Sequence, residues 1–361
     1  MPAGNMAGRF RGALLLGAFL PGLAALGAAQ TARRVTRLAD GVYAIEHQDR
    51  HDGFASGNTM VVIGQRQTLV VDAGFLPSTA REDIAQIRHW TMTPVAFLLN
   101  THFHNDHNLG NRAYLDAWPG LTIVAHRETK ADMDRFGPGS AARVERGMAR
   151  LERMVATGRT EAGQTLDSRD RAEVQRVLAQ RRAVLDEIRG VTFQSATLTF
   201  ERELTIDLGG RVVEIRFLGR GNTAGDAVAW LPRERIVATG DLVVHPLPYV
   251  YDGYPSEWSA TLDQLLRLGP AILVPGHGPV LRDTAFVTLT RDLFRSAVDQ
   301  LNAALAKTGP AMSRSLDEVK GMVNLAPFRN RFAGRDSSLA GEFDDMAANL
   351  LRVAFTEASL R

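Results

Sequence analysis

The sequence predicts a mixed α/β (α+β) fold, in which sheets are covered by helices. Short β-rich runs at residues 41–45, 58–64 and 68–72 are typical of an antiparallel meander. Helical and strand patterns then alternate across residues 78–126, which favours a sheet layer packed against helices. A second series of strand patterns follows across residues 197–274, with a Gly-Gly hairpin signal inside it.

Composition excludes several classes of protein. The chain has 361 residues, of which 45% are hydrophobic, so it can bury a large core in one domain or two. The 42 Lys and Arg residues nearly balance the 40 Asp and Glu residues, and no dense basic run suggests a nucleic-acid partner. The absence of cysteine excludes both a disulfide framework and a thiolate metal ligand.

The N-terminus has the pattern of a secretory signal peptide. Arg9 and Arg11 precede an apolar run at residues 13–26, and small residues follow it. This predicts a signal peptide over residues 1–29, because the apolar run is too short for a comfortable membrane span. An uncleaved anchor is the alternative. We therefore expect a periplasmic or secreted protein with no stable membrane anchor after cleavage.

A dense group of metal-ligand residues directly follows the apolar run at residues 95–99. His102 and His104 alternate at the end of this predicted strand, so both imidazoles can point the same way and chelate one ion. Asp106 and His107, on the turning backbone beyond, can reach a second ion. Imidazole with carboxylate suits zinc, with iron or manganese possible. A polar loop without metal is the alternative.

The pattern H-x-H-x-D-H at residues 102–107 resembles the signature of the metallo-β-lactamase-fold hydrolase superfamily. Two later motifs match the family in the same order: Asp241 in T-G-D resembles the aspartate that bridges two metals, and His277 in P-G-H-G resembles the last ligand. Asp72, which ends a strand in V-V-D-A-G, is similar to a residue that supports the metal histidines. The resemblance implies a four-layer αββα sandwich.

The resemblance also implies how the ligands are shared. Asp106, His107 and His277 would form one metal position, and Asp241 would bridge to the other. Asp106 is in addition the candidate catalytic residue, because it would orient the nucleophile. The implied metal ligands are His102, His104, Asp106, His107, Asp241 and His277.

One position departs from the family pattern. Where relatives have G-H-T, this chain has Asn222, and an amide oxygen is a weaker zinc ligand than imidazole. The position shared by His102 and His104 should therefore bind metal more loosely, with or without help from Asn222. A site that has lost its activity is the alternative.

The domain organisation follows from these motifs. Residues 35–285 should form the metallo-β-lactamase-fold domain, interrupted at residues 128–190 by a helical insertion with two helices and a polar linker. Residues 286–361 should form a helical C-terminal extension. This extension either packs on the sheet or supports a dimer, so the oligomeric state stays open.

An aromatic loop after Asp241 is the candidate substrate wall. Prolines stiffen this loop, and it follows a metal ligand directly, so its side chains could face the substrate. Aromatic packing at the sheet edge is the alternative. The candidate substrate-binding residues are His245, Tyr249, Tyr251 and Trp258.

Together these observations predict an exported zinc-dependent hydrolase of a small molecule, with one or two Zn²⁺ ions per chain. Metal-bound hydroxide would attack the carbonyl of an ester, lactone, thioester or amide. A class B-like β-lactamase is an alternative, but the bridging-type Asp241 favours weak or absent lactamase activity. An iron-dependent oxygen-using relative and a non-catalytic metal- or ligand-binding protein are two further hypotheses. The motifs do not select one substrate.

Overall fold

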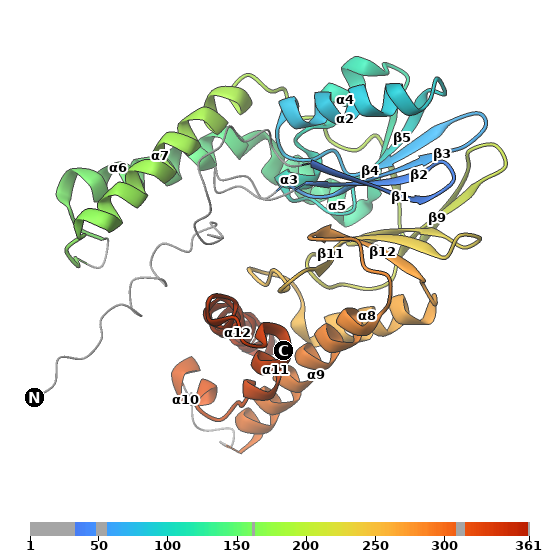
Figure 1. Ribbon diagram of the computed structural model, residues 1–361. Coiled ribbons are helices and arrows are strands. Elements are labelled where there is room, and N and C mark those ends of the chain that lie inside the picture. Colours follow the sequence, from blue (N-terminus) through green and yellow to red (C-terminus); the bar gives the residue numbers. More distant parts are fainter. Residues whose placement is uncertain (1–32, 48–55, 161–162, 308–314, 360–361) are drawn as a thin grey trace, which may run out of the picture.

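The computed structural model describes residues 33–47, 56–160, 163–307 and 315–359. The predicted signal peptide, residues 1–29, lies outside these ranges. Two sheets face each other between two layers of helices, which confirms the expected four-layer arrangement (Figure 1). Among the described residues, no helix has the length and apolar character needed to cross a membrane.

The first sheet has seven strands in the spatial order in which they occur in the chain. The first four are antiparallel, as the meander pattern predicted, and the remaining three are added in parallel. The sequence did not predict β1, because this edge strand is mostly half-exposed and has little hydrophobic periodicity. The strands are β1 (Arg33–Ala39), β2 (Val42–His47), β3 (Thr59–Ile63), β4 (Thr68–Val71), β5 (Val95–Leu99), β6 (Thr122–His126) and β7 (Leu198–Phe200).

The second sheet has five strands in the order β12-β11-β10-β9-β8. Strands β8 to β11 are antiparallel neighbours, and β12 pairs with β11 in parallel. The predicted Gly-Gly hairpin is confirmed between β8 and β9. The strands are β8 (Glu203–Asp207), β9 (Val212–Phe217), β10 (Ala227–Leu231), β11 (Ile236–Val244) and β12 (Ile272–His277).

A continuous apolar core joins the inner faces of the two sheets. Val62 and Leu69 from the first sheet belong to the same buried cluster as Ile215 and Leu231 from the second. Fully burying one such side chain contributes about 1.5–3 kcal/mol. The core therefore fixes the sheets against each other, and with them the strand ends that carry the candidate ligands.

The outer face of the first sheet is covered by α2 (Pro77–Trp90) and α4 (Asn111–Ala117) (Figure 1). Ile84 and Ile87 of α2 are buried against this sheet, as the amphipathic pattern predicted. A further helix, α5 (Arg127–Phe136), follows β6 and was not predicted as a separate element.

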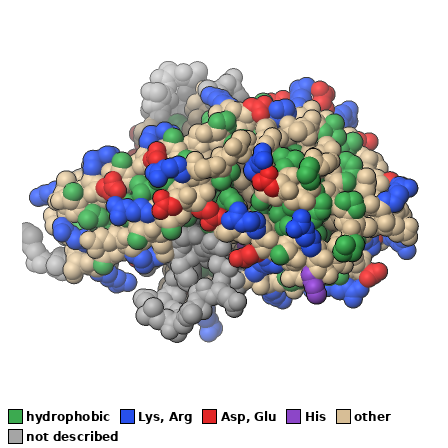
Figure 2. Space-filling view, turned by 90° about the horizontal axis from the view of Figure 1, so that it is seen from above, with side chains coloured by type: hydrophobic (Ala, Val, Ile, Leu, Met, Phe, Trp, Pro, Cys, Tyr) green, Lys and Arg blue, Asp and Glu red, His purple; other side chains and the backbone are tan. Residues whose placement is uncertain are grey.

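The two predicted helices of the insertion are present as α6 (Ser140–Thr157) and α7 (Ser168–Ile188). They form an arm that projects from the sandwich (Figure 1) and has its own apolar seam. Figure 2 shows basic and acidic side chains interspersed along the arm, as expected for a solvated helix face. Arg182 pairs with Glu152 across the two helices, at 3.0 Å.

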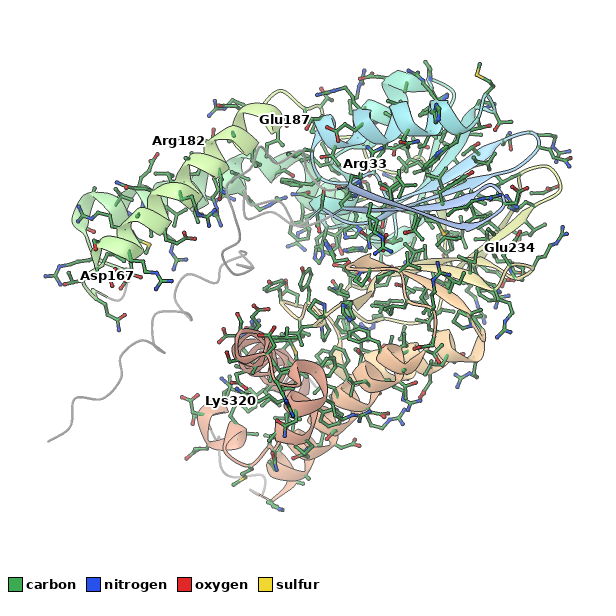
Figure 3. The ribbon with its side chains drawn as sticks, in the orientation of Figure 1. Arg33, Asp167, Arg182, Glu187, Glu234 and Lys320 are labelled. Atoms are coloured by element: carbon green, nitrogen blue, oxygen red, sulfur yellow. The ribbon has the colours of Figure 1, made fainter. Side chains whose placement is uncertain are left out.

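Glu187 fastens the base of the arm to α2. Its carboxylate accepts hydrogen bonds from the backbone N–H of Ser78, at 2.5 Å, and from the Ser78 hydroxyl, at 3.1 Å. In Figure 3, Glu187 lies beside the sandwich while Asp167 marks the far end of the arm. A helix N-terminus favours a carboxylate, so this contact stabilises α2 and the arm together.

The C-terminal extension packs on the outer face of the second sheet, which was one of the two expected arrangements. Phe294, Phe343 and Leu350 from this extension share one buried cluster with strand residues such as Val237. The sequence predicted three of its helices and missed α11. The helices on this side are α8 (Pro255–Arg267), α9 (Ala285–Ala306), α10 (Leu316–Lys320), α11 (Ala326–Ala333) and α12 (Ser337–Ser359).

Trp258 belongs to this core, which corrects its assignment as a substrate-binding residue. Its side chain is fully buried, its ring stacks on Phe294 at 4.5 Å, and its Nε1 donates to the Leu242 carbonyl at 3.2 Å. The position in the first turn of α8 directs the ring toward the sheet rather than toward the loop. Trp258 therefore has no surface that a substrate could reach.

We predict that Trp258→Ala lowers the free energy of unfolding by about 3–5 kcal/mol, because it leaves a cavity and an unpaired carbonyl. Urea denaturation measures this change. Tyr251→Ala is the control, since that side chain is 47% exposed, and it should change stability by less than about 0.5 kcal/mol. Equal, small effects of both variants would contradict the core assignment.

Candidate metal centre

Six ligand-type side chains from separate parts of the chain converge at one edge of the two sheets. The loop after β5 leads into the one-turn helix α3 (Asn105–Asn108), while β11 and β12 approach from the other sheet. Each parallel strand ends at this edge, so residues far apart in the sequence meet here. The six residues are His102, His104, Asp106, His107, Asp241 and His277.

The first group consists of Asp106, His107, Asp241 and His277, whose ligand atoms all lie within 4.8 Å of one another. Asp106 Oδ2 is 3.0 Å from His277 Nε2, and Asp241 Oδ1 is 3.2 Å from His107 Nε2. The two Nε2 atoms of His107 and His277 are 3.3 Å apart. One divalent cation among these atoms would have two nitrogen and two oxygen donors.

The second group consists of His102, His104 and Asp241. His102 Nε2 is 2.9 Å from His104 Nδ1 and 3.7 Å from Asp241 Oδ2. Asp241 therefore directs one carboxylate oxygen toward each group. This is the geometry of a carboxylate that can bridge two ions.

Asp72 holds the backbone and one ring of this centre in place. Its carboxylate accepts hydrogen bonds from the Thr101 N–H and the Thr101 hydroxyl, both at 2.8 Å. Its Oδ2 also lies 2.8 Å from His107 Nδ1. When Nδ1–H donates to Asp72, His107 Nε2 keeps its lone pair for the first group. Asp72 has a φ of 60°, a conformation that is strained for a non-glycine residue.

Gly276 is required by the close packing beside Asp241. A Cβ atom at this position would lie 1.9 Å from Asp241 Oδ1. Any side chain would displace the carboxylate that serves both groups. Close packing against Asp241 therefore explains why the first glycine of the P-G-H-G motif, Gly276, cannot carry a side chain.

Burial and charge set the protonation of these side chains. Burial lowers the pKa of His102 well below its ordinary value, and the neighbouring His107 adds to this effect. Burial by itself would raise the pKa of Asp106 and of Asp241, but the adjacent histidines outweigh it and hold both pKa values well below the ordinary range. The centre thus combines ionised carboxylates with imidazoles, which is the state that binds metal.

His107 and His277 behave in the opposite way. Burial lowers the pKa of each ring, but the carboxylates of Asp241 and Asp106 outweigh it and raise the pKa, for His107 well above its ordinary value. Two negative charges therefore attract a cation to this position, whether a proton or a metal ion. Because a ligand imidazole must be neutral, metal would bind here in competition with protons.

The donor set fits a divalent cation. Asp241 Oδ1 is buried and accepts no hydrogen bond from the described residues, although a buried carboxylate oxygen without a partner is costly. Four imidazoles and two carboxylates suit zinc or iron, which accept nitrogen donors. Magnesium and calcium instead prefer sites that consist of oxygen donors. A bound cation would satisfy the unpaired oxygen.

Asn222 lines the same cavity as His104 of the second group, and its side-chain NH2 group is used in a hydrogen bond. The side chain is buried, and its Nδ2 donates to the Tyr249 carbonyl at 3.2 Å. Because Asn222 stands where the family pattern has the histidine of G-H-T, the second group has two histidines and a shared carboxylate. The first group, with four donor residues, offers more metal ligands than the second, which has three.

A cavity of about 310 Å³ opens onto the second group at His104 and Asn222. Its wall includes Tyr254 from the loop after β11 and Arg352 from α12. Sequence reasoning missed Arg352, because α12 has the pattern of an ordinary amphipathic helix. Its position beside the cavity depends on how the C-terminal extension folds back over the second sheet.

The remaining candidate substrate residues occupy different places. Tyr249 packs against His277, with ring centroids 5.1 Å apart, and Tyr251 lies beside Tyr249 with 47% exposure. His245 is half-buried against Phe286 and belongs to neither ligand group. Tyr249 thus contacts the ring of a candidate ligand, whereas His245 reaches the same residue by donating its backbone N–H to the His277 carbonyl, at 3.1 Å.

Asp226 is a buried carboxyl that sequence reasoning did not single out. Its two oxygens accept hydrogen bonds from the Thr223 N–H, at 2.9 Å, and the Thr223 hydroxyl, at 2.7 Å. Burial raises the pKa of Asp226 to about 7, against these hydrogen bonds, which lower it. The folded protein therefore retains a proton that the unfolded chain loses near pH 4.

This difference predicts a pH-dependent effect of Asp226→Asn. Since the folded state binds the extra proton, wild-type stability should fall relative to the variant as pH rises from about 4 to about 7. The accumulated difference should be on the order of 3 kcal/mol. Urea denaturation of the metal-free proteins at pH 5 and pH 8 measures it, and parallel curves for the two proteins would contradict the raised pKa.

Comparison with known proteins gives consistent results. The family model described as metallo-beta-lactamase superfamily matches residues 52–277. The chain is 35% identical over 96 residues to metallo-beta-lactamase type 2 of Bacillus sp. (strain 170), covering 25% of this chain and 37% of that protein. It is 24% identical over 274 residues to linear primary-alkylsulfatase of Pseudomonas sp. (strain ATCC 19151), covering 72% and 48%. The chain thus spans less than half of either relative.

Solved structures share the fold. The crystal structure of DIM-1 metallo-beta-lactamase aligns with a TM-score of 0.51 and 19% identity, covering 73% of this chain and 98% of that one. The metallo-beta-lactamase from Pontibacter korlensis aligns with a TM-score of 0.52 and 19% identity, covering 73% and 99%. At this level of identity the likeness concerns the arrangement of the backbone.

Proposed function

Because the chain belongs to the metallo-β-lactamase superfamily, we propose that it is a metal-dependent hydrolase of a small molecule. The observation that carries this proposal is the convergence of four imidazoles and two carboxylates, in two groups that share Asp241, beside a cavity. A purely structural cluster would not need a cavity at its edge.

Metal at this centre would lower the pKa of a water molecule and polarise the bond to be cleaved. Asp106 is the candidate catalytic residue, because its side chain is 24% exposed whereas that of Asp241 is 2% exposed. Its carboxylate can therefore hold a water molecule by hydrogen bonding, while His102, His107, Asp241 and His277 stay buried. Asp72 orients His107, and the paired sheets keep water away from the inner side of the centre.

Zinc is the proposed cofactor, with one or two ions per chain, since imidazole and carboxylate donors suit it. Iron and manganese are the other metals that this donor set admits. Metal analysis of the purified protein separates the three, and oxygen uptake by an iron-loaded protein would overturn the hydrolase assignment. The charged, apolar and small-residue pattern at the N-terminus supports our proposal that the protein is exported.

The substrate classes that we propose are esters, lactones, thioesters and amides. A cavity of about 310 Å³ suits a small molecule. The similarity to an alkylsulfatase over 72% of this chain supports adding a sulfate ester to the substrates tested. Our expectation for β-lactams is weak or absent hydrolysis, because Asp241 offers a bridging carboxylate.

We predict that Asp106→Asn reduces kcat/KM by on the order of 100-fold or more for the best substrate in such a panel, because the amide loses a charged metal donor and water acceptor. Steady-state kinetics with zinc-loaded protein measure the loss, and chelation should abolish wild-type activity. Asp116→Asn is the matched control, since this exposed aspartate pairs with Arg112 at 2.7 Å and belongs to neither ligand group.

No hydrolysis of any panel member by the zinc-loaded wild type would contradict the proposal. It would favour a protein that binds metal or ligand without turnover. Equal activities of wild type, Asp106→Asn and Asp116→Asn would exclude Asp106 from catalysis.

We also predict unequal metal affinities. The first group should bind zinc more tightly than the second, and Asn222→His should lower the second dissociation constant by about 10-fold or more, because it adds an imidazole donor. Chelator competition measures both constants. Asn222→Ala is the control and should leave the second constant nearly unchanged if the amide does not bind metal. A large loss in this control would instead identify Asn222 as a ligand.

A further inference from the structure

Gly57 and Asn58, the two residues directly before β3, connect the two segments that carry Asp106, His107 and His277 of the first ligand group. The Gly57 N–H donates to the Asp106 carbonyl at 3.0 Å, and the Asn58 N–H donates to the Gly276 carbonyl at 2.7 Å. The two segments belong to different sheets and are far apart in the sequence. The Gly57–Asn58 segment therefore fixes the distance between them.

The Asn58 side chain holds the turn around His277 on both sides. Its Nδ2 donates to the Pro275 carbonyl at 3.0 Å and to the Gly278 carbonyl at 2.8 Å. Its Oδ1 accepts a hydrogen bond from the His47 N–H at 3.1 Å. This buried amide thus uses both of its protons on the loop that positions one candidate ligand.

Gly57 packs against the ring of another candidate ligand. A Cβ atom at this position would lie 2.4 Å from His107 Cε1 and 2.8 Å from His107 Nε2. Only a bare backbone can approach the imidazole this closely. The segment therefore touches His107 by packing and Asp106 by a backbone hydrogen bond.

A buried charged pair supports the segment from behind. His47 Nδ1 lies 2.7 Å from the Gly57 carbonyl, and His47 Nε2 lies 3.1 Å from Asp83. Asp83 also pairs with Arg33 of β1, at 3.0 Å. His47 and Asp83 are both buried and belong to neither ligand group, and among the described residues it is Gly57 and Asn58 that connect His47 to the centre.

We propose that Gly57 and Asn58, supported by His47 and Asp83, are positioning residues that hold Asp106, His107 and His277 together as the tighter metal position. None of the four is a candidate ligand. The two histidines of the second group, His102 and His104, take no part in these contacts, so the segment should act mainly on the first group. The inference rests on the proposed metal site, but it does not require hydrolysis.

The test is the zinc affinity of Asn58→Ala. Removing two hydrogen bonds to the His277 turn should raise the dissociation constant of the tighter position by about 10- to 100-fold, the effect typical of residues that orient a ligand. The weaker constant should stay within about 3-fold of the wild type, far below that effect. Chelator competition gives both constants, and cobalt(II) absorption reports the geometry of each position. His104→Ala, which spares the first group, assigns the cobalt bands.

Val62→Ala is the control for a general loss of stability. Val62 lies on the same strand and is fully buried, so its truncation should lower stability by about 1–3 kcal/mol without changing either zinc constant. Two results would overturn the proposal: wild-type zinc constants in Asn58→Ala, or an equal rise of both constants. If Asn58→Ala does not fold, His47→Gln provides the same test, because it alters the His47 contacts with the Gly57 carbonyl and Asp83 and changes no candidate ligand.

These measurements need no substrate, so they separate this proposal from the proposed function. A protein that is inactive against every substrate but loses only its tighter zinc in Asn58→Ala would support the positioning role and contradict the hydrolase assignment. An active hydrolase with unchanged zinc constants in Asn58→Ala would contradict the positioning role and support the hydrolase assignment.

Discussion

The burial of charged and polar ligand side chains is the constraint on which this structure depends. His102, His107, Asp241 and His277 are almost completely removed from solvent. Each such group is costly to bury unless its partners are fixed. The partners must therefore come from rigid elements, and the two sheets supply them because their parallel strands end at a common edge. The core between the sheets, the strain at Asp72 and the missing side chain at Gly276 all serve this convergence.

The two ligand groups meet this constraint to different degrees. The first has four donors and is tied together through backbone contacts of Gly57 and Asn58. The second has two histidines and one shared carboxylate, and the side-chain NH2 group of the nearby Asn222 donates to the Tyr249 carbonyl. The first group is held by more contacts, and the cavity opens beside the second group. This suggests that the first group keeps the centre in place and that the second faces the incoming molecule.

The two additions to the sandwich have separate consequences. The α6–α7 arm stands away from the sheets and is joined to α2 through Glu187 (Figure 3). The C-terminal extension instead covers the second sheet, and α12 brings Arg352 to the cavity. An extension that buries an otherwise exposed sheet face thus also forms part of the wall beside the candidate centre.

The family resemblance implied the roles of Asp72, Asp241 and His277. The sequence by itself determined the local features: nearly every strand, the helices of the arm and the ligand motif at residues 102–107. Hydrophobic periodicity and ligand spacing are properties of short segments, so they can be read from the chain. Only the tertiary structure decided that Trp258 belongs to the core, that α12 reaches the cavity and that Asn58 forms hydrogen bonds to the turn around His277. These contacts join residues far apart in the sequence, and their geometry depends on how whole layers pack.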